Sequence, residues 1–122
     1  KLLLNNYGFN KESKIYFKDE INYALGNIIQ NAILYSKNEI KIFLKINKNE
    51  FIIKVEDDGY GFSRDVLDKL GEPYISKNKK GLGLGIFIAK NLIENMKGNI
   101  VFYNSYNKGA VVEIKFDKTI LI

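Results

Sequence analysis

Two asparagines, Asn27 and Asn31, stand four residues apart in a segment whose apolar residues follow a helical period. At this spacing both side chains lie on one face of a helix, beside its apolar stripe. A side-chain amide there offers an oxygen to a metal ion and an NH2 group to a phosphate. Taken alone, the pair is more simply explained as two solvated asparagines in an asparagine-rich chain.

Acidic residues and glycines follow an apolar, strand-like run in the segment 56–61, Glu-Asp-Asp-Gly-Tyr-Gly. Such a sequence often forms a turn and nothing more. The functional interpretation is a carboxylate fixed at the mouth of a pocket. The glycines would then let a flat ligand approach the backbone.

A basic, glycine-rich segment, 77–85, leads directly into an apolar helical pattern. Free backbone N–H groups and the helix dipole favour an anion at such a helix start, and the lysines add positive charge. The spacing matches neither a Walker A loop nor a dinucleotide fingerprint. A flexible linker is the alternative. The preceding segment, 71–77, by itself predicts a turn at Pro73 with a buried aromatic residue.

Periodicity and turn residues predict the elements that position these clusters. Asp19 is the expected N-cap of the first helix, whose inward residues are Ile21, Leu25, Ile28, Ile29, Ala32 and Ile33, and Gly98 is the expected stop of the second. The order predicts a two-layer α/β sandwich, with about three helices on one face of a mixed β-sheet. The expected elements are a strand at 14–17, a helix from 19 to about 36, strands at 40–46 and 51–55 joined by a hairpin turn at 47–50, a short helix at 63–70, a helix at 84–96, and strands at 100–103 and 110–116.

Composition limits the classes of function. The 122 residues suit one domain, and the absence of cysteine and histidine excludes disulfide frameworks, Cys or His metal sites and Ser-His chemistry. The formal charge of +5 is spread along the chain, so nucleic-acid binding is the weaker alternative. We see neither a signal peptide nor a bilayer-spanning run, and without an initial Met we expect a piece of a longer protein.

In this order the clusters resemble the ATP-binding catalytic domain of sensor histidine kinases, in the GHKL ATPase superfamily with the Bergerat fold. The resemblance covers about residues 14–116. Segments 25–32, 57–61, 71–77 and 81–84 resemble the N, G1, F and G2 boxes of that family. The amino-acid sequences of segments 70–74 and 83–90 resemble most closely those of redox-sensing kinases of the RegB/PrrB type. We expect the catalytic domain at 14–118, a linker or the end of a preceding segment at 1–13, and a tail at 119–122.

The resemblance implies a role for each site residue. Asp57 would accept a hydrogen bond from the adenine amino group, and Asn31 would bind Mg²⁺ through its side-chain oxygen. Asn27 would help to hold the phosphates. The other implied ATP contacts are Tyr35 against the nucleotide, Gly59 and Gly61 beneath the base, Lys77, Lys79 and Lys80 toward the polyphosphate, and the backbone of Gly81, Leu82, Gly83 and Leu84 around it.

Some positions depart from the family pattern. Leu34 stands where many members carry Lys or Arg, Lys79 replaces a G2 glycine, and Ala110 replaces a hydroxyl residue. Asn27 stands where members that hydrolyse ATP or phosphorylate serine usually carry Glu. Because an amide cannot accept a proton from water, Asn27 favours a histidine kinase over an ATPase.

The chain has no histidine, so the phosphoacceptor must lie elsewhere. The implied partners are a histidine-bearing dimerisation domain and a response regulator, with no nucleic acid and with membrane contact only through missing regions. The expected location is the cytoplasmic part of a membrane-bound sensor. The alternatives are a non-catalytic GHKL switch module that binds nucleotide or a partner protein, and a basic nucleic-acid-binding domain.

Overall fold

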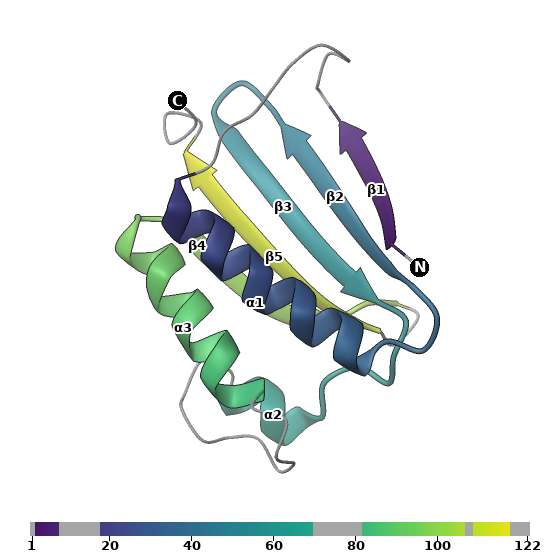
Figure 1. Ribbon diagram of the computed structural model, residues 1–122. Helices are drawn as coiled ribbons and strands as arrows, with labels where there is room; N and C mark the ends of the chain where they lie inside the picture. The colour runs from purple at the N-terminus through teal and green to yellow at the C-terminus, as the bar shows by residue number, and fades with distance from the viewer. Residues whose placement is uncertain (1, 8–17, 70–81, 107–108, 118–122) are drawn as a thin grey trace.

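The computed structural model describes residues 2–7, 18–69, 82–106 and 109–117 (Figure 1). It is a two-layer α/β sandwich, as the sequence predicts. The described elements are β1 (Leu2–Tyr7), α1 (Asp19–Tyr35), β2 (Ile40–Ile46), β3 (Glu50–Asp57), α2 (Arg64–Lys69), α3 (Leu82–Asn95), β4 (Asn99–Asn104) and β5 (Ala110–Asp117).

The strands of the described residues form one mixed sheet in the order β1-β2-β3-β5-β4. β1 pairs with β2 in parallel, and the remaining neighbours are antiparallel. The register places Ile40 at the start of β2 opposite Asp57 at the end of β3. This brings the acidic turn after β3 next to the segment that leads from α1 into β2.

The core lies between the sheet and the helices α1 and α3, which run side by side across one sheet face (Figure 1). Alternation along the strands sends Ile53, Val55 and Ile114 into this layer, while lysines and glutamates face the other side. The helices contribute residues at helical spacing. These are Ile21, Ala24, Ile28 and Ala32 of α1 and Ile86, Ala89 and Ile93 of α3.

The predicted strands and helices downstream of residue 18 are confirmed, with two corrections in α1. The N-cap is Lys18, which makes no side-chain capping bond, and Asp19 is already in the first turn, where its charge suits the helix dipole. The predicted inward position of Ile33 is wrong, because its side chain is 60% exposed. The apolar pattern extended beyond the buried face, which ends at Ala32.

The first residues also differ from the expectation. Residues 1–13 were expected to be a linker or the end of a preceding segment, whereas Leu2–Tyr7 form β1 at the edge of the sheet. Leu-Leu-Leu-Asn-Asn-Tyr shows no alternation, and only the pairing with β2 identifies it as a strand. The strand predicted at 14–17 lies outside the described residues.

The end of α3 refines the role predicted for Gly98. The N–H of Gly98 donates to the Ile93 carbonyl at 2.9 Å, so the helix does stop here. The left-handed residue is Lys97, however, with φ 63°. Gly98 is required for space instead, since an added Cβ would lie 2.6 Å from the Phe116 ring and 2.9 Å from Ile93. No helix in the described segments combines the length and apolar character needed to cross a membrane.

Candidate functional site

Asn27 and Asn31 lie on the face of α1 that is turned toward the beginning of α3. A Cβ added to Gly85 would lie 3.6 Å from Asn31 Nδ2 and 3.9 Å from Asn27 Cβ. Both Nδ2 atoms are buried, and neither has a hydrogen-bond partner within the described part of the chain. Because an unsatisfied buried polar group costs about 1–3 kcal/mol, two adjacent ones call for a ligand or water. They are therefore not the solvated pair that their sequence context alone suggested.

The same face of α1 ends beside the acidic turn. Tyr35 is one further helical step from Asn31, and its carbonyl oxygen lies so close to Gly59 that no side chain fits there. Gly59 is thus required at this contact. Gly61 follows with φ 80°, a backbone conformation that suits glycine. The turn and the end of α1 are consequently in direct backbone contact.

Asp57 is the buried carboxylate of the site, with 8% of its surface exposed. Its Oδ1 accepts hydrogen bonds from the N–H of Gly59 at 2.8 Å and of Ala110 at 3.2 Å. Burial raises the pKa of Asp57 above its ordinary value of 3.8, although these two hydrogen bonds oppose the shift. Both hydrogen bonds found in the described residues end on Oδ1, so Oδ2 is the oxygen left to accept from a ligand.

Asp58, which the sequence analysis left without a role, faces the segment between α1 and β2. Its carboxylate accepts hydrogen bonds from the backbone N–H groups of Lys37, Asn38 and Glu39 at 2.7–3.2 Å. Burial acts to raise the pKa of Asp58, but these amide bonds outweigh it and lower the pKa below 3.8. Its partners are 19–21 residues away in sequence, so no local pattern could have indicated them.

Asn104 is a second residue that the sequence analysis missed. Its side chain forms a two-point contact with Phe62, accepting from the backbone N–H at 2.7 Å and donating to the carbonyl at 2.9 Å. This contact ties the segment after Gly61 to the end of β4. The partners are 42 residues apart, so no local signal could have predicted it.

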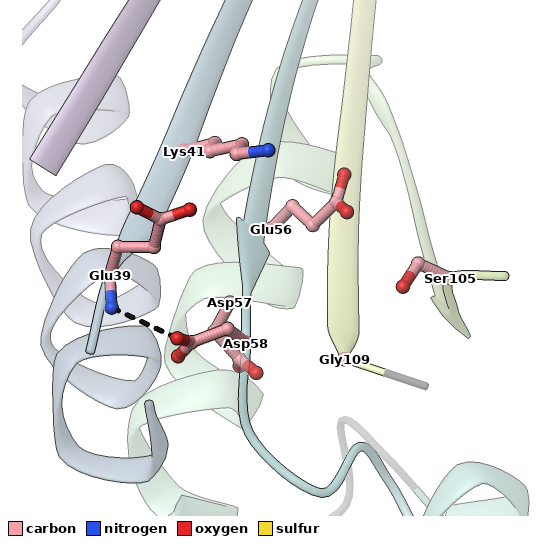
Figure 2. A pocket seen from close by; sticks show the side chains of 7 residues that line it. All are labelled: Glu39, Lys41, Glu56, Asp57, Asp58, Ser105 and Gly109. Carbon is pink, nitrogen blue, oxygen red and sulfur yellow. Dashed lines mark hydrogen bonds between the residues drawn. The ribbon is translucent and has the colours of Figure 1, made fainter. Parts of the chain in front are cut away.

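A pocket of about 150 Å³ opens on the other face of the sheet, behind Asp57 (Figure 2). Figure 2 shows the acidic side chains of Glu39, Glu56, Asp57 and Asp58 around it, together with Lys41. The Oγ of Ser105, at its far wall, is buried and unpaired within the described residues. Among those residues no group of three or more acidic side chains could hold a metal ion. The lining residues are Glu39, Lys41, Glu56, Asp57, Asp58, Ser105 and Gly109.

The tertiary structure thus joins Asn27, Asn31, Tyr35, Gly59 and Asp57 into one continuous strip along α1 and the end of β3. Leu82, Gly83 and Leu84 form the first turn of α3, on the side of Asn27 and Asn31. The remaining predicted contacts, and the segment resembling the F box, lie outside the described residues; these contacts are Lys77, Lys79, Lys80 and Gly81.

Comparison with known proteins assigns the class. The family described as histidine kinase-, DNA gyrase B- and HSP90-like ATPase matches residues 18–120, and the chain belongs to this family. The fold is similar to the catalytic domain of histidine kinase ThkA, with a TM-score of 0.78 and 25% identity, covering 96% of this chain and 80% of that one. The prediction of an ATP-binding catalytic domain is confirmed.

Curated relatives point to the same class. The chain is 35% identical over 99 residues to sporulation kinase B of Bacillus subtilis (strain 168), which covers 79% of this chain and 23% of that protein. It is 32% identical over 127 residues to "Putative sensor histidine kinase NtrY-like" of Rickettsia bellii (strain RML369-C), covering 96% and 21% respectively. The chain therefore spans roughly a fifth to a quarter of the length of these relatives.

Proposed function

We propose that this domain binds ATP along the strip from Asp57 to Asn27 and supplies the γ-phosphoryl group to a histidine outside the described chain. The observation that carries the proposal is the pair of buried Nδ2 atoms of Asn27 and Asn31, which have no hydrogen-bond partner among the described residues and face the glycine-led start of α3. Such amide nitrogens beside a helix N-terminus suit a phosphate chain, because both they and the backbone N–H groups of the first helical turn are donors.

Adenine would occupy the Asp57 end of the strip. Oδ2 of Asp57 can accept from an exocyclic amino group, while Oδ1 is held by Gly59 and Ala110. The absence of a side chain on Gly59 lets the turn pack against the end of α1, which keeps Asp57 beside Tyr35. Tyr35, at the end of the same helix face, would contact the nucleotide.

The phosphates would lie between Asn27, Asn31 and the first turn of α3, with Lys77, Lys79 and Lys80 as further contacts. Asn31 is a suitable magnesium ligand, because its side-chain oxygen is a ligand type that Mg²⁺ accepts and Mg²⁺ needs few protein ligands when phosphates supply the rest. When bound, Mg²⁺ would neutralise charge on the phosphates. Asn27 would orient the phosphate chain by hydrogen bonds.

Transfer to histidine fits these residues better than ATP hydrolysis. Asn27 cannot remove a proton from water, and within the described residues no carboxylate is hydrogen-bonded to its Nδ2. A neutral imidazole nitrogen is already a nucleophile and needs no such base. The proposed partners are therefore a histidine-bearing dimerisation domain and, downstream, a response regulator. Location in the cytoplasmic part of a membrane-bound sensor belongs to the same proposal.

We also propose that the chain is related to redox sensors of the RegB/PrrB type, because the amino-acid sequences of segments 70–74 and 83–90 resemble theirs. If it holds, the intact kinase changes its autophosphorylation rate with the redox state of its medium. An unchanged rate between oxidising and reducing medium would remove this part of the proposal.

The test is to titrate the chain with Mg-ADP and a non-hydrolysable ATP analogue, and then to add labelled ATP with a histidine-bearing dimerisation domain. We expect saturable nucleotide binding, label transfer to that domain and little hydrolysis by the chain alone. Brisk ATP hydrolysis by the isolated chain would contradict the proposal. Nucleotide binding without transfer to any histidine domain would favour a switch module instead.

A further inference from the structure

The carboxylate of Asp58 fastens the segment that joins α1 to β2. Oδ1 accepts from the N–H of Lys37 at 2.7 Å and of Asn38 at 3.1 Å, and Oδ2 accepts from Asn38 at 3.0 Å and Glu39 at 3.2 Å. Figure 2 shows the last of these contacts, between Glu39, just before β2, and Asp58 in the turn after β3. Three consecutive amides therefore converge on one charged side chain.

These hydrogen bonds act at the Asp57 end of the proposed nucleotide site, where the turn after β3 meets the end of α1. Asp58 directly follows Asp57, and the three amides begin two residues after Tyr35, the last residue of α1. Between them lies the backbone contact of Tyr35 with Gly59. Lys37 makes a further contact on this side, with its Nζ 4.2 Å from the centre of the Tyr60 ring. The Asp58 hydrogen bonds, the Tyr35–Gly59 contact and the Lys37–Tyr60 contact thus all join the Asp57 turn to the end of α1.

We propose, on the basis of the nucleotide site above, that Asp58 is a positioning residue for ATP. It does not contact the nucleotide. It holds the Asp57 turn against the end of α1, so that the adenine and phosphate contacts are at the separation that one ATP molecule requires. Charge-assisted hydrogen bonds suit this role, because they are short and strongly directional.

The packing of the core distinguishes a positioning role of Asp58 from a general contribution of Asp58 to folding. α1 and β3 are also joined through the core, where Ile28, Ala32 and Val55 are buried. The fold therefore does not depend on Asp58 alone, whereas at the end of α1 the Asp58 hydrogen bonds act with the Tyr35–Gly59 and Lys37–Tyr60 contacts to hold the turn in place. Loss of the carboxylate is expected to weaken nucleotide binding more than it lowers the melting temperature.

The experiment compares Asp58→Ala and Asp58→Asn with wild type in the complete 122-residue chain. Calorimetry gives the Kd for Mg-ADP, hydrogen exchange gives the protection of the amides of residues 37–39, and a thermal scan reports folding. We expect Asp58→Ala to raise the Kd about ten-fold, or ~1.4 kcal/mol, with loss of protection at 37–39. Asp58→Asn keeps one acceptor oxygen, so its Kd is expected to lie between those of wild type and Asp58→Ala.

Glu39→Gln is the matched control, because its side chain lines the same pocket while only its backbone bonds to Asp58. We expect its Kd to stay within about two-fold of wild type. The inference is overturned if Asp58→Ala loses protection at 37–39 but keeps the wild-type Kd, or if the Kd rises while the amides stay protected. If Asp58→Ala does not fold, Asp58→Asn decides by the same readouts. A wild-type chain that binds no nucleotide rejects the proposed function itself.

Discussion

At the scale of single residues, the site depends on two adjacent carboxylates in different environments. Asp57 is buried and its pKa is raised, whereas Asp58 receives three backbone amides and its pKa is lowered. Folding therefore favours the protonated form of Asp57 and the ionised form of Asp58. The neighbours have separate tasks: one offers an oxygen to a ligand, and the other fixes the backbone around it.

Because the pKa of Asp57 is raised on folding, the effect of replacing Asp57 on the free energy of unfolding is expected to depend on pH. A carboxyl whose pKa is raised on folding contributes stability that is lost as the pH rises through that raised value. The neutral Asn in Asp57→Asn lacks this loss, so the variant gains stability relative to wild type from pH 4 to pH 7. Urea unfolding at both pH values measures the difference. A difference that shrinks toward pH 7 would contradict the expected direction.

The same variant tests the adenine contact. An amide in place of the Asp57 carboxylate presents a donor or a weaker acceptor to the adenine amino group, so we expect the Kd for Mg-ADP to rise by about 10–100-fold, in line with a lost hydrogen bond to a charged group. Glu56→Gln, one residue away on the open face of the sheet, should leave the Kd unchanged. Calorimetry on both variants checks this, and equal effects would exclude a specific role for Asp57.

At the scale of elements, close backbone contacts decide which glycines matter. A side chain at Gly59 would meet the Tyr35 carbonyl, whereas a Cβ at Gly26 on α1 has no neighbour within 4 Å. One glycine joins two elements, and the other only interrupts a helix surface. The two positions therefore form a matched pair.

Gly59→Ala is expected to push the turn away from α1, to destabilise the fold by at least about 1 kcal/mol and to weaken nucleotide binding. Gly26→Ala is expected to stabilise the chain by about 0.5–1 kcal/mol, because alanine is the better helix former. Urea denaturation measures both changes. Equal stability of the two variants would show that the turn tolerates the added methyl group.

The end of α3 offers a stability test outside the site. Lys97 adopts a left-handed conformation that glycine accepts more easily. Lys97→Gly is therefore expected to raise the free energy of unfolding by about 0.5–1 kcal/mol, without changing nucleotide affinity. Chemical denaturation and calorimetry on this variant provide the check, and a loss of stability would mean that the Lys97 side chain has a role of its own.

At the scale of the whole molecule, one face of the sheet is covered by helices, and β1 pairs with β2 to form one edge of the sheet (Figure 1). The acidic turn after β3 and the end of α1 lie at one end of the sandwich. The opposite end holds the β2–β3 hairpin, in which Asn47 Oδ1 accepts from the N–H groups of Asn49 and Glu50. The acidic turn and the hairpin are thus separated by the length of β3.

Removal of residues 1–7 would uncover the edge of β2. Because unpaired strand edges promote association between chains, the truncated chain is expected to melt at a lower temperature and to elute partly as larger species. Size-exclusion chromatography and a thermal scan test this expectation. A truncated chain that remains monomeric with unchanged melting temperature would show that β1 does not protect the sheet.

Most of the fold follows from local pattern. The alternation of Ile40, Ile42 and Leu44, the hairpin turn and the helical spacing around Ile28 and Ile93 each require one kind of element, because only one geometry buries their apolar residues together. The limits of the buried face of α1 and of the first strand do not follow from local pattern. Ile33 fits the apolar pattern of α1 although it is exposed, and the residues of β1 show no alternation. Its strand conformation depends on pairing with a distant segment.

The amino-acid order alone determined the class of the domain, the two-layer sandwich and the identities of Asn27, Asn31, Tyr35 and Asp57 as site candidates. Only the tertiary structure decided which polar groups of the described residues remain without partners and which carboxylate accepts hydrogen bonds from a distant stretch of backbone. The physical reason is that hydrogen-bond satisfaction and burial depend on residues far apart in the chain. Asp58 meets its amides across 19–21 residues, and Phe62 meets Asn104 across 42.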